Sequence, residues 1–142
     1  DLIAPEGVMG KIQPNTRGKA DIAYGIEVAK RLGELDVGQA VIVENGYVLG
    51  VEAAEGTDAL LERCAKLKYT PQRTGVLVKA KKPLQERRVD LPAIGLITVQ
   101  NVYNAGLAGI AIEAEGSLIL DRSEVIAKAD ELGLFLVGIR HE

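Results

Sequence analysis

Hydrophobic and polar positions follow two different periods along this chain. Between residues 20 and 32 apolar side chains recur at helical spacing and Gly33 follows, which predicts a helix that ends near this glycine. Two short apolar runs, 40–43 and 47–51, flank Asn45-Gly46. This dipeptide between apolar runs is the strongest short-range signal for a β-hairpin. The first half of the chain therefore predicts a helix followed by a hairpin.

The second half continues the mixture of helix and strand patterns. We expect a helix that is capped by Thr57 and runs to about Lys68, then a strand at 76–78, then a helix at 98–105 that is closed by Gly106. A second hairpin should follow, in which 109–113 pairs with 117–120 around Glu115-Gly116. The last elements are a helix that begins with a capping box of Asp121 and Glu124 and runs to Leu132, and a strand at 134–139. Tight two-residue turns join antiparallel strands. The pattern thus predicts an α/β domain over residues 1–142, with a mixed sheet, two hairpins and flanking helices.

Composition narrows the class of protein. The 142 residues are 47% hydrophobic and 26% charged, which suits one globular domain with a single core. The formal net charge of -3 argues against nucleic acid as a partner, and four tyrosines and one phenylalanine offer little surface for stacking bases. The sequence shows neither an apolar run long enough for a membrane span nor a signal peptide. We therefore expect a cytoplasmic protein.

Two residue types that often carry chemistry are nearly absent. Cys64 is the one cysteine, and its leucine neighbours predict a core position. His141 is the one histidine and lies at the end of the chain. The sequence therefore argues against catalysis by a serine–histidine or cysteine–histidine pair.

An acidic turn follows the first hairpin. Glu52, Glu55 and Asp58 lie within seven residues, where a strand passes into a helix. Mg²⁺ takes a few oxygen ligands of this kind and keeps its other positions for water and phosphate, and the Gly56-Thr57 amides before a helix suit a phosphate. The alternative is structural: Gly56 makes the turn, Thr57 and Asp58 cap the helix, and both glutamates are solvated.

A mixed-charge loop follows the strand at 76–78. Between Lys79 and Asp90 lie Lys82, Arg87 and Arg88, interleaved with Glu86. Such cations can hold a diphosphate, and such anions can hold its metal ion. A solvated loop without a ligand is the alternative, although prolines at 83 and 92 restrict it at both ends.

Gln39 stands just before the first strand of the first hairpin, after Asp36-Val-Gly38. Its amide suits the edge of a uracil or a ribose, or it caps the sheet. The sequence leaves both interpretations open.

Several polar blocks together resemble one known family. The blocks are Asp36-Val-Gly-Gln39, Glu52-Ala-Ala-Glu55-Gly-Thr-Asp58, Lys79-Ala-Lys-Lys82-Pro, Gln85-Glu-Arg-Arg-Val-Asp90-Leu-Pro-Ala-Ile-Gly95, Ala105-Gly-Leu-Ala-Gly-Ile-Ala-Ile-Glu113-Ala and Ala129-Asp-Glu-Leu-Gly-Leu-Phe. In this order they resemble the C-terminal domain of the UDP-2,3-diacylglucosamine pyrophosphatases of lipid A biosynthesis. The family usually has Gln-Asp at Gln85-Glu86 and Gly-Pro at Gly95-Leu96. A glutamate at position 86 shifts its carboxylate by about one methylene, which bears on whether it binds metal.

The resemblance implies the catalytic half of a two-domain enzyme whose smaller N-terminal domain lies outside this chain. It implies Mg²⁺-dependent hydrolysis of UDP-2,3-diacylglucosamine to 2,3-diacylglucosamine 1-phosphate and UMP. The substrate would be a UDP-linked acylated sugar, and peripheral contact with the inner membrane surface and a homodimer are further expectations.

The resemblance and the residue chemistry together give a predicted site. The predicted catalytic residues are Asp90, Lys79, Lys82 and Arg88, the predicted substrate-binding residues are Gln39, Gly56, Thr57 and Gln85, and the predicted metal ligands are Glu55, Asp58 and Glu86. Asp90 is a further candidate for holding Mg²⁺. This site requires the acidic turn and the mixed-charge loop to face a common cleft. The alternative functions are a non-catalytic module that binds a nucleotide or sugar phosphate, and a remnant that dimerises through its hairpins.

Overall fold

A computed structural model describes residues 2–83 and 91–141 of the chain, and its elements alternate between strands and helices. In chain order they are β1 (Gly7–Met9), α1 (Thr16–Glu34), β2 (Ala40–Glu44), β3 (Tyr47–Val51), α2 (Thr57–Ala65), β4 (Val76–Lys79), β5 (Ala93–Ile94), α3 (Leu96–Asn104), β6 (Gly109–Glu113), β7 (Leu118–Ile119), α4 (Arg122–Glu131) and β8 (Phe135–Ile139). The predicted α/β class with a mixed sheet is confirmed.

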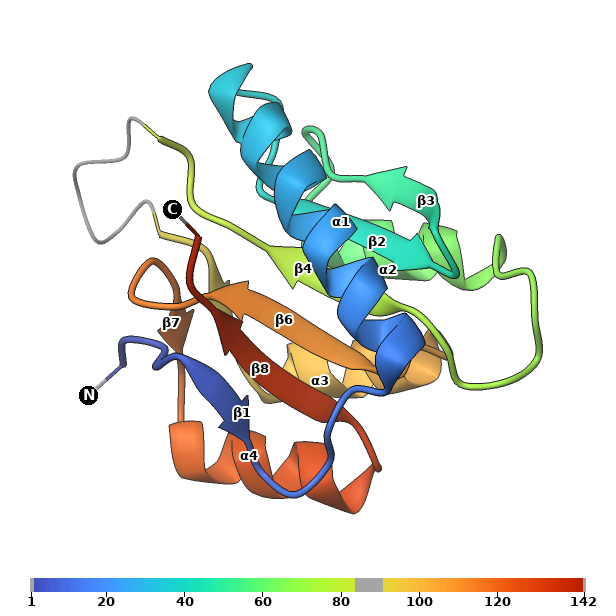
Figure 1. The fold of residues 1–142 in the computed structure, drawn as a ribbon, viewed down its shortest axis with the longest axis vertical. Coiled ribbons are helices and arrows are strands. Elements are labelled where there is room, and N and C mark those ends of the chain that lie inside the picture. Colours follow the sequence, from blue (N-terminus) through green and yellow to red (C-terminus); the bar gives the residue numbers. More distant parts are fainter. Residues whose placement is uncertain (1, 84–90, 142) are drawn as a thin grey trace.

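The main sheet has six strands in the order β1-β8-β6-β4-β2-β3. Strands β4, β6 and β8 are parallel, whereas β2 runs antiparallel to β4 and β1 antiparallel to β8 (Figure 1). The carboxyl ends of the three parallel strands therefore share one edge of the sheet. The start of β2 and the end of β3 lie at this same edge, because β2 is antiparallel to both of its neighbours.

The sheet separates two apolar layers. Helix α1 crosses one face over β2 and β4, where Ile22 and Ile26 pack against Val41 and Val78 (Figure 1). Helices α2, α3 and α4 cover the other face, and their apolar side chains join alternate residues of the central strands. The central strands are buried on both sides, as expected for parallel strands between helices. None of the helices in the described parts of the chain has the length and apolar character needed to cross a membrane.

The first predicted hairpin is confirmed. Strands β2 and β3 pair with Glu44 opposite Tyr47, and the turn places Asn45 at φ 50° and Gly46 at φ 85°. Two successive positive φ values are what a tight turn between twisted strands requires, and asparagine and glycine tolerate them best. The buried carboxylate of Asp21 in α1 accepts hydrogen bonds from both turn amides, at 2.9 and 2.8 Å, and so holds the hairpin against the helix.

The second predicted hairpin is wrong. Strand β6 pairs with β4 and β8, both parallel, and β7 leaves the main sheet to pair with β5. In this small sheet Ala93 lies opposite Leu118, and Ile94 lies opposite Ile119. The turn around Glu115, which has φ 64°, therefore redirects the chain between two sheets and does not reverse it within one.

All four helix starts differ in detail from the prediction: α1 begins at Thr16, four residues before the predicted range, and α3 begins at Leu96, two residues before it. Asn15 caps α1, with its side-chain oxygen accepting from the Gly18 amide at 2.8 Å. Gly56, at φ 89°, occupies the cap position of α2 that was predicted for Thr57. Asp121 precedes α4 at φ 54° without a side-chain capping bond, so the predicted capping box is absent. In the left-handed conformation the Asp121 side chain does not reach back to the amides of the first turn.

Candidate functional site

Polar side chains gather at the edge of the sheet where the parallel strands end. Lys79 closes β4, Glu113 closes β6, Glu52 follows β3 and Gln39 precedes β2. Strand pairing brings these positions together although they are far apart in sequence. The carboxyl ends of parallel strands are the usual place for ligand sites in open α/β sheets. We call this end of the sheet, where β4, β6 and β8 finish, the carboxyl edge.

Lys79 is the central cation of the carboxyl edge. It is only 8% exposed, and its Nζ donates a hydrogen bond to the Ala93 carbonyl oxygen at 3.0 Å. Burial lowers the pKa of Lys79, and the charges of Glu52 and Asp58 oppose that shift. A lysine ammonium has three donors, so this contact leaves Lys79 able to bind an anion. The structure thus links Lys79 to both the acidic turn and β5.

Glu52 organises the acidic turn. One carboxylate oxygen accepts from the Gln39 amide at 3.0 Å, and the other accepts from the Thr57 hydroxyl at 2.9 Å. Glu52 therefore ties the start of β2 to the start of α2. Space at this point is minimal, since a Cβ added at Gly38 would lie 2.0 Å from the Glu52 carbonyl oxygen. The backbone of Gln39 and the side chain of Thr57, both predicted to bind substrate, contact Glu52 in this structure.

Asp58 lies in the first turn of α2, next to α3. The Asn101 side-chain amide donates to Asp58 Oδ1 at 3.1 Å, and no described residue contacts Oδ2 through a hydrogen bond or ion pair. Asp58 also lines a groove of about 360 Å³ between α2 and α3. Its exposed oxygen and its position near Lys79 make it the acidic side chain of the described turn that is best placed for a cation.

Glu55 points away along α2. Its carboxylate forms an ion pair with Arg63 at 2.5 Å, and the hydrogen bond from Arg63 lowers the pKa of Glu55. Arg63 also donates to the Val51 carbonyl oxygen at 3.2 Å. Glu55 was predicted as a metal ligand, and in this structure it holds the end of β3 to α2 through Arg63.

Lys82 also has an acidic partner. Its Nζ lies 2.7 Å from Asp36 Oδ1, in the turn between α1 and β2. This pair fastens the segment after β4 to the end of α1. The other predicted residues of that segment, Gln85, Glu86, Arg88 and Asp90, lie outside the described residues.

The residues that follow this range lie close to the carboxyl edge. Pro92 is buried, and its carbonyl oxygen accepts from the Leu118 amide at 2.9 Å. Ala93, the next residue, contacts Lys79. The described end of the loop thus lies beside Lys79, and its meeting with the acidic turn stays a prediction.

A buried ion pair at the end of β6 was missed by sequence reasoning. Lys30 Nζ of α1 contacts both oxygens of Glu113, at 3.0 and 3.2 Å, and also the Lys81 carbonyl oxygen at 3.1 Å. The Lys81 amide donates to Glu113 Oε1 at 3.0 Å. Glu113 thus fixes the backbone that leaves β4 toward residues 84–90. A glutamate that ends a fully apolar strand was the signal available in the sequence.

The acidic side chains of the described residues determine which ligands they can offer to the expected Mg²⁺. In the ranges 2–83 and 91–141, no three aspartate, glutamate, histidine or cysteine side chains form a cluster able to hold a metal ion. Asp58 nevertheless offers an oxygen at the carboxyl edge, and Mg²⁺ is commonly bound by one or two carboxylates together with phosphate and water. The described part of the chain therefore supplies one carboxylate toward such a site, Asp58, and further ligands would have to come from outside it.

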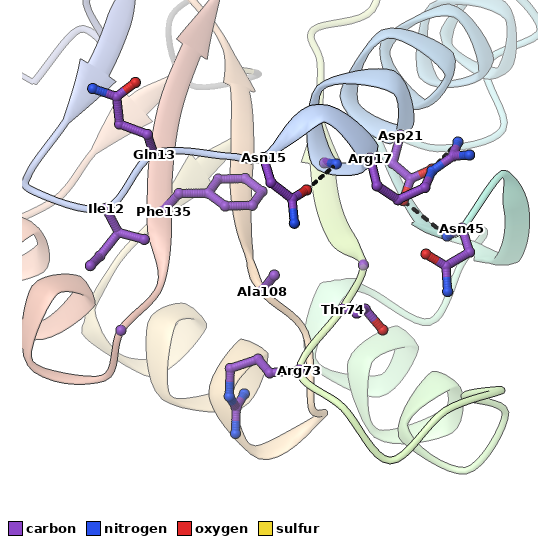
Figure 2. Close-up of a pocket in the computed structure, with 13 residues that line it drawn as sticks. Ile12, Gln13, Asn15, Arg17, Asp21, Asn45, Arg73, Thr74, Ala108 and Phe135 are labelled. Carbon is purple, nitrogen blue, oxygen red and sulfur yellow. Dashed lines mark hydrogen bonds and ion pairs between the residues drawn. The ribbon is translucent and has the colours of Figure 1, made fainter.

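A pocket of about 410 Å³ lies at the opposite edge, near the starts of β4, β6 and β8 (Figure 2). Its two arginines already have partners. Arg17 contacts Asp21 at 2.8 Å, and Arg73 donates to the carbonyl oxygens of Tyr103 and Leu107 at 2.8 and 3.0 Å. The first contact lies within α1, and the second holds the segment before β4 against the end of α3. Both arginines are thus engaged within the fold, so the carboxyl edge remains the better candidate site.

Comparisons with known proteins show which family the chain belongs to. A family model described as the LpxI C-terminal domain matches residues 5–137. The chain is also 49% identical over 144 aligned residues to the UDP-2,3-diacylglucosamine pyrophosphatase LpxI of Caulobacter vibrioides. This alignment covers 98% of the chain and 51% of the relative, so the chain spans about half the length of that protein. The chain therefore belongs to the LpxI C-terminal domain family.

Proposed function

We propose that this chain is the catalytic half of an enzyme that hydrolyses UDP-2,3-diacylglucosamine to 2,3-diacylglucosamine 1-phosphate and UMP in lipid A biosynthesis, in the cytoplasm. The name of the Caulobacter relative and the shared family support the substrate class. The single structural observation that carries the proposal is the buried Lys79, which lies between the acidic turn and β5 at the carboxyl edge.

Lys79 binds the diphosphate in this proposal. Its ammonium is largely withdrawn from water, which strengthens its attraction for a phosphate oxygen. The Ala93 carbonyl oxygen orients the ammonium and leaves its other donors for the ligand. A bound phosphate also raises the pKa of Lys79 again, because an opposite charge stabilises the protonated form.

The start of α2 provides a second contact for phosphate. Gly56 has no side chain to cap the helix, and the Thr57 hydroxyl is directed to Glu52. The amides of this first turn therefore have no side-chain cap, and the positive end of the helix dipole favours an anion. Gly56 and Thr57 thus act through their backbone in the proposed site.

Asp58 is the described residue that we propose as a ligand for Mg²⁺, with Glu86 and Asp90 as the predicted ligands from the range outside the described residues. Bound there, Mg²⁺ would neutralise charge on the diphosphate. Glu55, the remaining predicted ligand, has its carboxylate in the ion pair with Arg63.

The attacking water must lose a proton. The one histidine of the chain is residue 141, two positions past β8. We assign the proton to a carboxylate, and Asp90 is our candidate because in the sequence it lies two residues after Arg88 and two residues before Pro92. The water oxygen bonds to one phosphorus, the bridging P–O bond breaks, and UMP and the sugar 1-phosphate separate.

The test is UMP release from UDP-2,3-diacylglucosamine by the full-length protein, with and without a chelator. We expect release that the chelator suppresses and that Asp90→Ala lowers by at least about 100-fold, while Glu131→Ala on the exposed side of α4 has no effect. Turnover by Asp90→Ala within about tenfold of the parent would remove Asp90 from the mechanism. Saturable binding of the UDP-sugar without cleavage would instead identify a binding module.

A further inference from the structure

The Asn45-Gly46 turn of the first hairpin carries a pair of groups that can react with each other and that the proposed function does not use. A backbone amide attacks the preceding asparagine side chain most readily when it belongs to glycine, because glycine has no Cβ to hinder the approach. Asn45 is half-buried and Gly46 is exposed, so water reaches the turn. None of the described residues restrains the Asn45 side-chain amide through a hydrogen bond or ion pair.

The reaction between these groups is an intramolecular deamidation. The Gly46 nitrogen loses its proton and bonds to the side-chain carbonyl carbon of Asn45. The bond from that carbon to the side-chain nitrogen breaks, and this nitrogen takes up a proton and leaves as ammonia. A cyclic succinimide remains, and water opens it at either carbonyl carbon to give aspartate or isoaspartate. Water is the only other reactant.

The carboxylate of Asp21 opposes the first step in the folded chain. It accepts hydrogen bonds from the Asn45 amide at 2.9 Å and from the Gly46 amide at 2.8 Å, and Figure 2 shows Asp21 directed from α1 toward the turn. Asp21 is only 1% exposed, so water screens its charge poorly. Loss of the Gly46 proton would place a negative nitrogen beside this negative oxygen, where like charges repel strongly. The two hydrogen bonds also keep the Gly46 nitrogen from turning toward the Asn45 side chain.

We propose that Asn45 is a deamidation site, and that Asp21 keeps it unreactive for as long as the hairpin is docked on α1. The Gly46 nitrogen becomes available for attack only when its hydrogen bond to Asp21 opens. The rate of the modification therefore follows the population of molecules in which the hairpin has opened locally. This inference is independent of the proposed function, because the turn lies at the end of β2 opposite to the carboxyl edge.

The products of the reaction do not fit the original turn. Isoaspartate lengthens the backbone between residues 45 and 46, whereas two successive positive φ values suit a tight connection of two ordinary residues. Aspartate keeps the backbone, but it adds a carboxylate to a turn whose amides are already bound by Asp21. The hydrolysis that opens the succinimide does not restore asparagine, so each local opening that leads to reaction leaves a permanent change in the chain.

The test is incubation of the full-length protein at mildly alkaline pH. Peptide mass spectrometry then measures conversion of the Asn45 carboxamide to a carboxylic acid, and hydrogen exchange is measured at the Gly46 amide. The folded parent is compared with the parent in urea, where the turn is open. It is also compared with Asp21→Asn, which removes the buried charge, and with Glu27→Gln, which removes an exposed carboxylate from the same helix and is the matched control.

We expect Asn45 in the folded parent to react at least about 100-fold more slowly than in urea, which is the scale of opening two hydrogen bonds to a charged group. Folded Asp21→Asn should react at least about tenfold faster than the parent, with faster exchange at the Gly46 amide.

Glu27→Gln should stay within about twofold of the parent, as is usual for surface substitutions. Equal rates for the folded and the unfolded parent, or equally fast exchange at the Gly46 amide in both, would overturn the inference. A folded Asp21→Asn variant that reacts no faster than the parent would also overturn it, and a slower reaction would mean that the carboxylate promotes removal of the proton. If Asp21→Asn does not fold, the comparison of folded and unfolded parent decides.

Discussion

The Lys79 ammonium lies 3.0 Å from the Ala93 carbonyl oxygen, and this contact joins the main sheet to the small β5–β7 sheet. The lysine is buried, and no ion pair within 4.0 Å joins it to a described residue. A buried cation held by one neutral oxygen and by more distant carboxylates costs stability. Residues of this kind are expected where function requires a charge.

Replacing Lys79 with methionine should therefore stabilise the chain. We expect the free energy of unfolding at neutral pH to rise by about 1 kcal/mol, because a buried charge is exchanged for an apolar group of similar length. Urea unfolding measures this, with the exposed Lys66→Met as control. The same Lys79→Met variant should lose affinity for UDP, and a less stable variant would contradict the account.

The pH dependence gives an independent check on Lys79. Its pKa is lowered in the folded protein, so between that pKa and the ordinary value of 10.5 the unfolded chain binds more protons. The contribution of Lys79 to stability therefore becomes less unfavourable as the pH rises through this window. The free energy by which Lys79→Met is more stable than the parent should become smaller as the pH rises toward 10.5. A difference that becomes larger with pH would contradict the lowered pKa of Lys79.

Asp58 and Glu55 were both predicted as metal ligands, and the structure separates them. Asp58→Asn keeps an oxygen for the Asn101 amide but removes the charge, so we expect kcat/KM to fall at least about tenfold and more Mg²⁺ to be required. Glu55→Gln weakens only the pair with Arg63, and kcat/KM should stay within about twofold. Magnesium titrations of UMP release compare the two variants. An equal loss of kcat/KM in both variants would indicate that Glu55 is also a metal ligand.

Glu44 forms a buried polar cluster at the far edge of the sheet. Its carboxylate accepts from Lys68 Nζ at 2.6 Å, the Tyr69 amide at 2.8 Å and the Thr74 hydroxyl at 2.5 Å. Burial alone would raise the pKa of Glu44, but the hydrogen bonds from Lys68, Thr74 and Tyr69 outweigh it, so the pKa is lowered. The cluster holds the segment between α2 and β4 against the end of β2.

Glu44→Gln should destabilise the chain by about 3 kcal/mol at pH 7, because it leaves the Lys68 ammonium buried without its counter-charge. A lowered pKa means that the stabilisation is complete above the unfolded value, near 4.5, and is lost as the pH falls through the folded value. In urea unfolding, parent and variant should converge as the pH falls below 4.5 and through the lowered pKa of Glu44 in the folded protein. The exposed Glu124→Gln should follow the parent throughout, and a constant gap between parent and Glu44→Gln would rule out this account.

Glu113 should act as a positioning residue. Glu113→Gln removes the charge that holds Lys30 and weakens the bond to the Lys81 amide. We expect hydrogen exchange at the Lys81 amide to accelerate at least about tenfold and kcat to fall while KM changes little. Glu115→Gln, two residues further on and exposed, is the control. Unchanged exchange at Lys81 together with a loss of kcat would point to direct contact with substrate instead.

The sequence predicted those parts of the fold that depend on local signals. Asn45-Gly46 specifies a tight turn by itself, so the first hairpin was recognisable. Glu115-Gly116 occupies a similar pattern, yet β7 pairs with β5, which lies about 25 residues earlier in the chain. Strand partners at such separations depend on which buried edge is available in three dimensions, and periodicity carries no information on that.

The same distinction applies to the site. Lys79 and the acidic turn were recognisable because charged residues stand directly after apolar strands. The partners of these charged residues could not be recognised from the sequence. Asp36 lies opposite Lys82 and Lys30 opposite Glu113 only because α1 crosses the sheet at a particular angle. Single-sequence reasoning therefore identified candidate residues but could not separate those free for a ligand from those already neutralised.

Gly38 has a consequence for how this family can vary. Its missing side chain leaves room for the Glu52 carbonyl oxygen, and any Cβ would collide with backbone that cannot rotate away. Relatives with altered substrates should therefore still keep glycine here, because occupied volume and not chemistry sets the requirement. In a library that is randomised at position 38 and selected for correct folding but not for activity, we expect to find only glycine at this position.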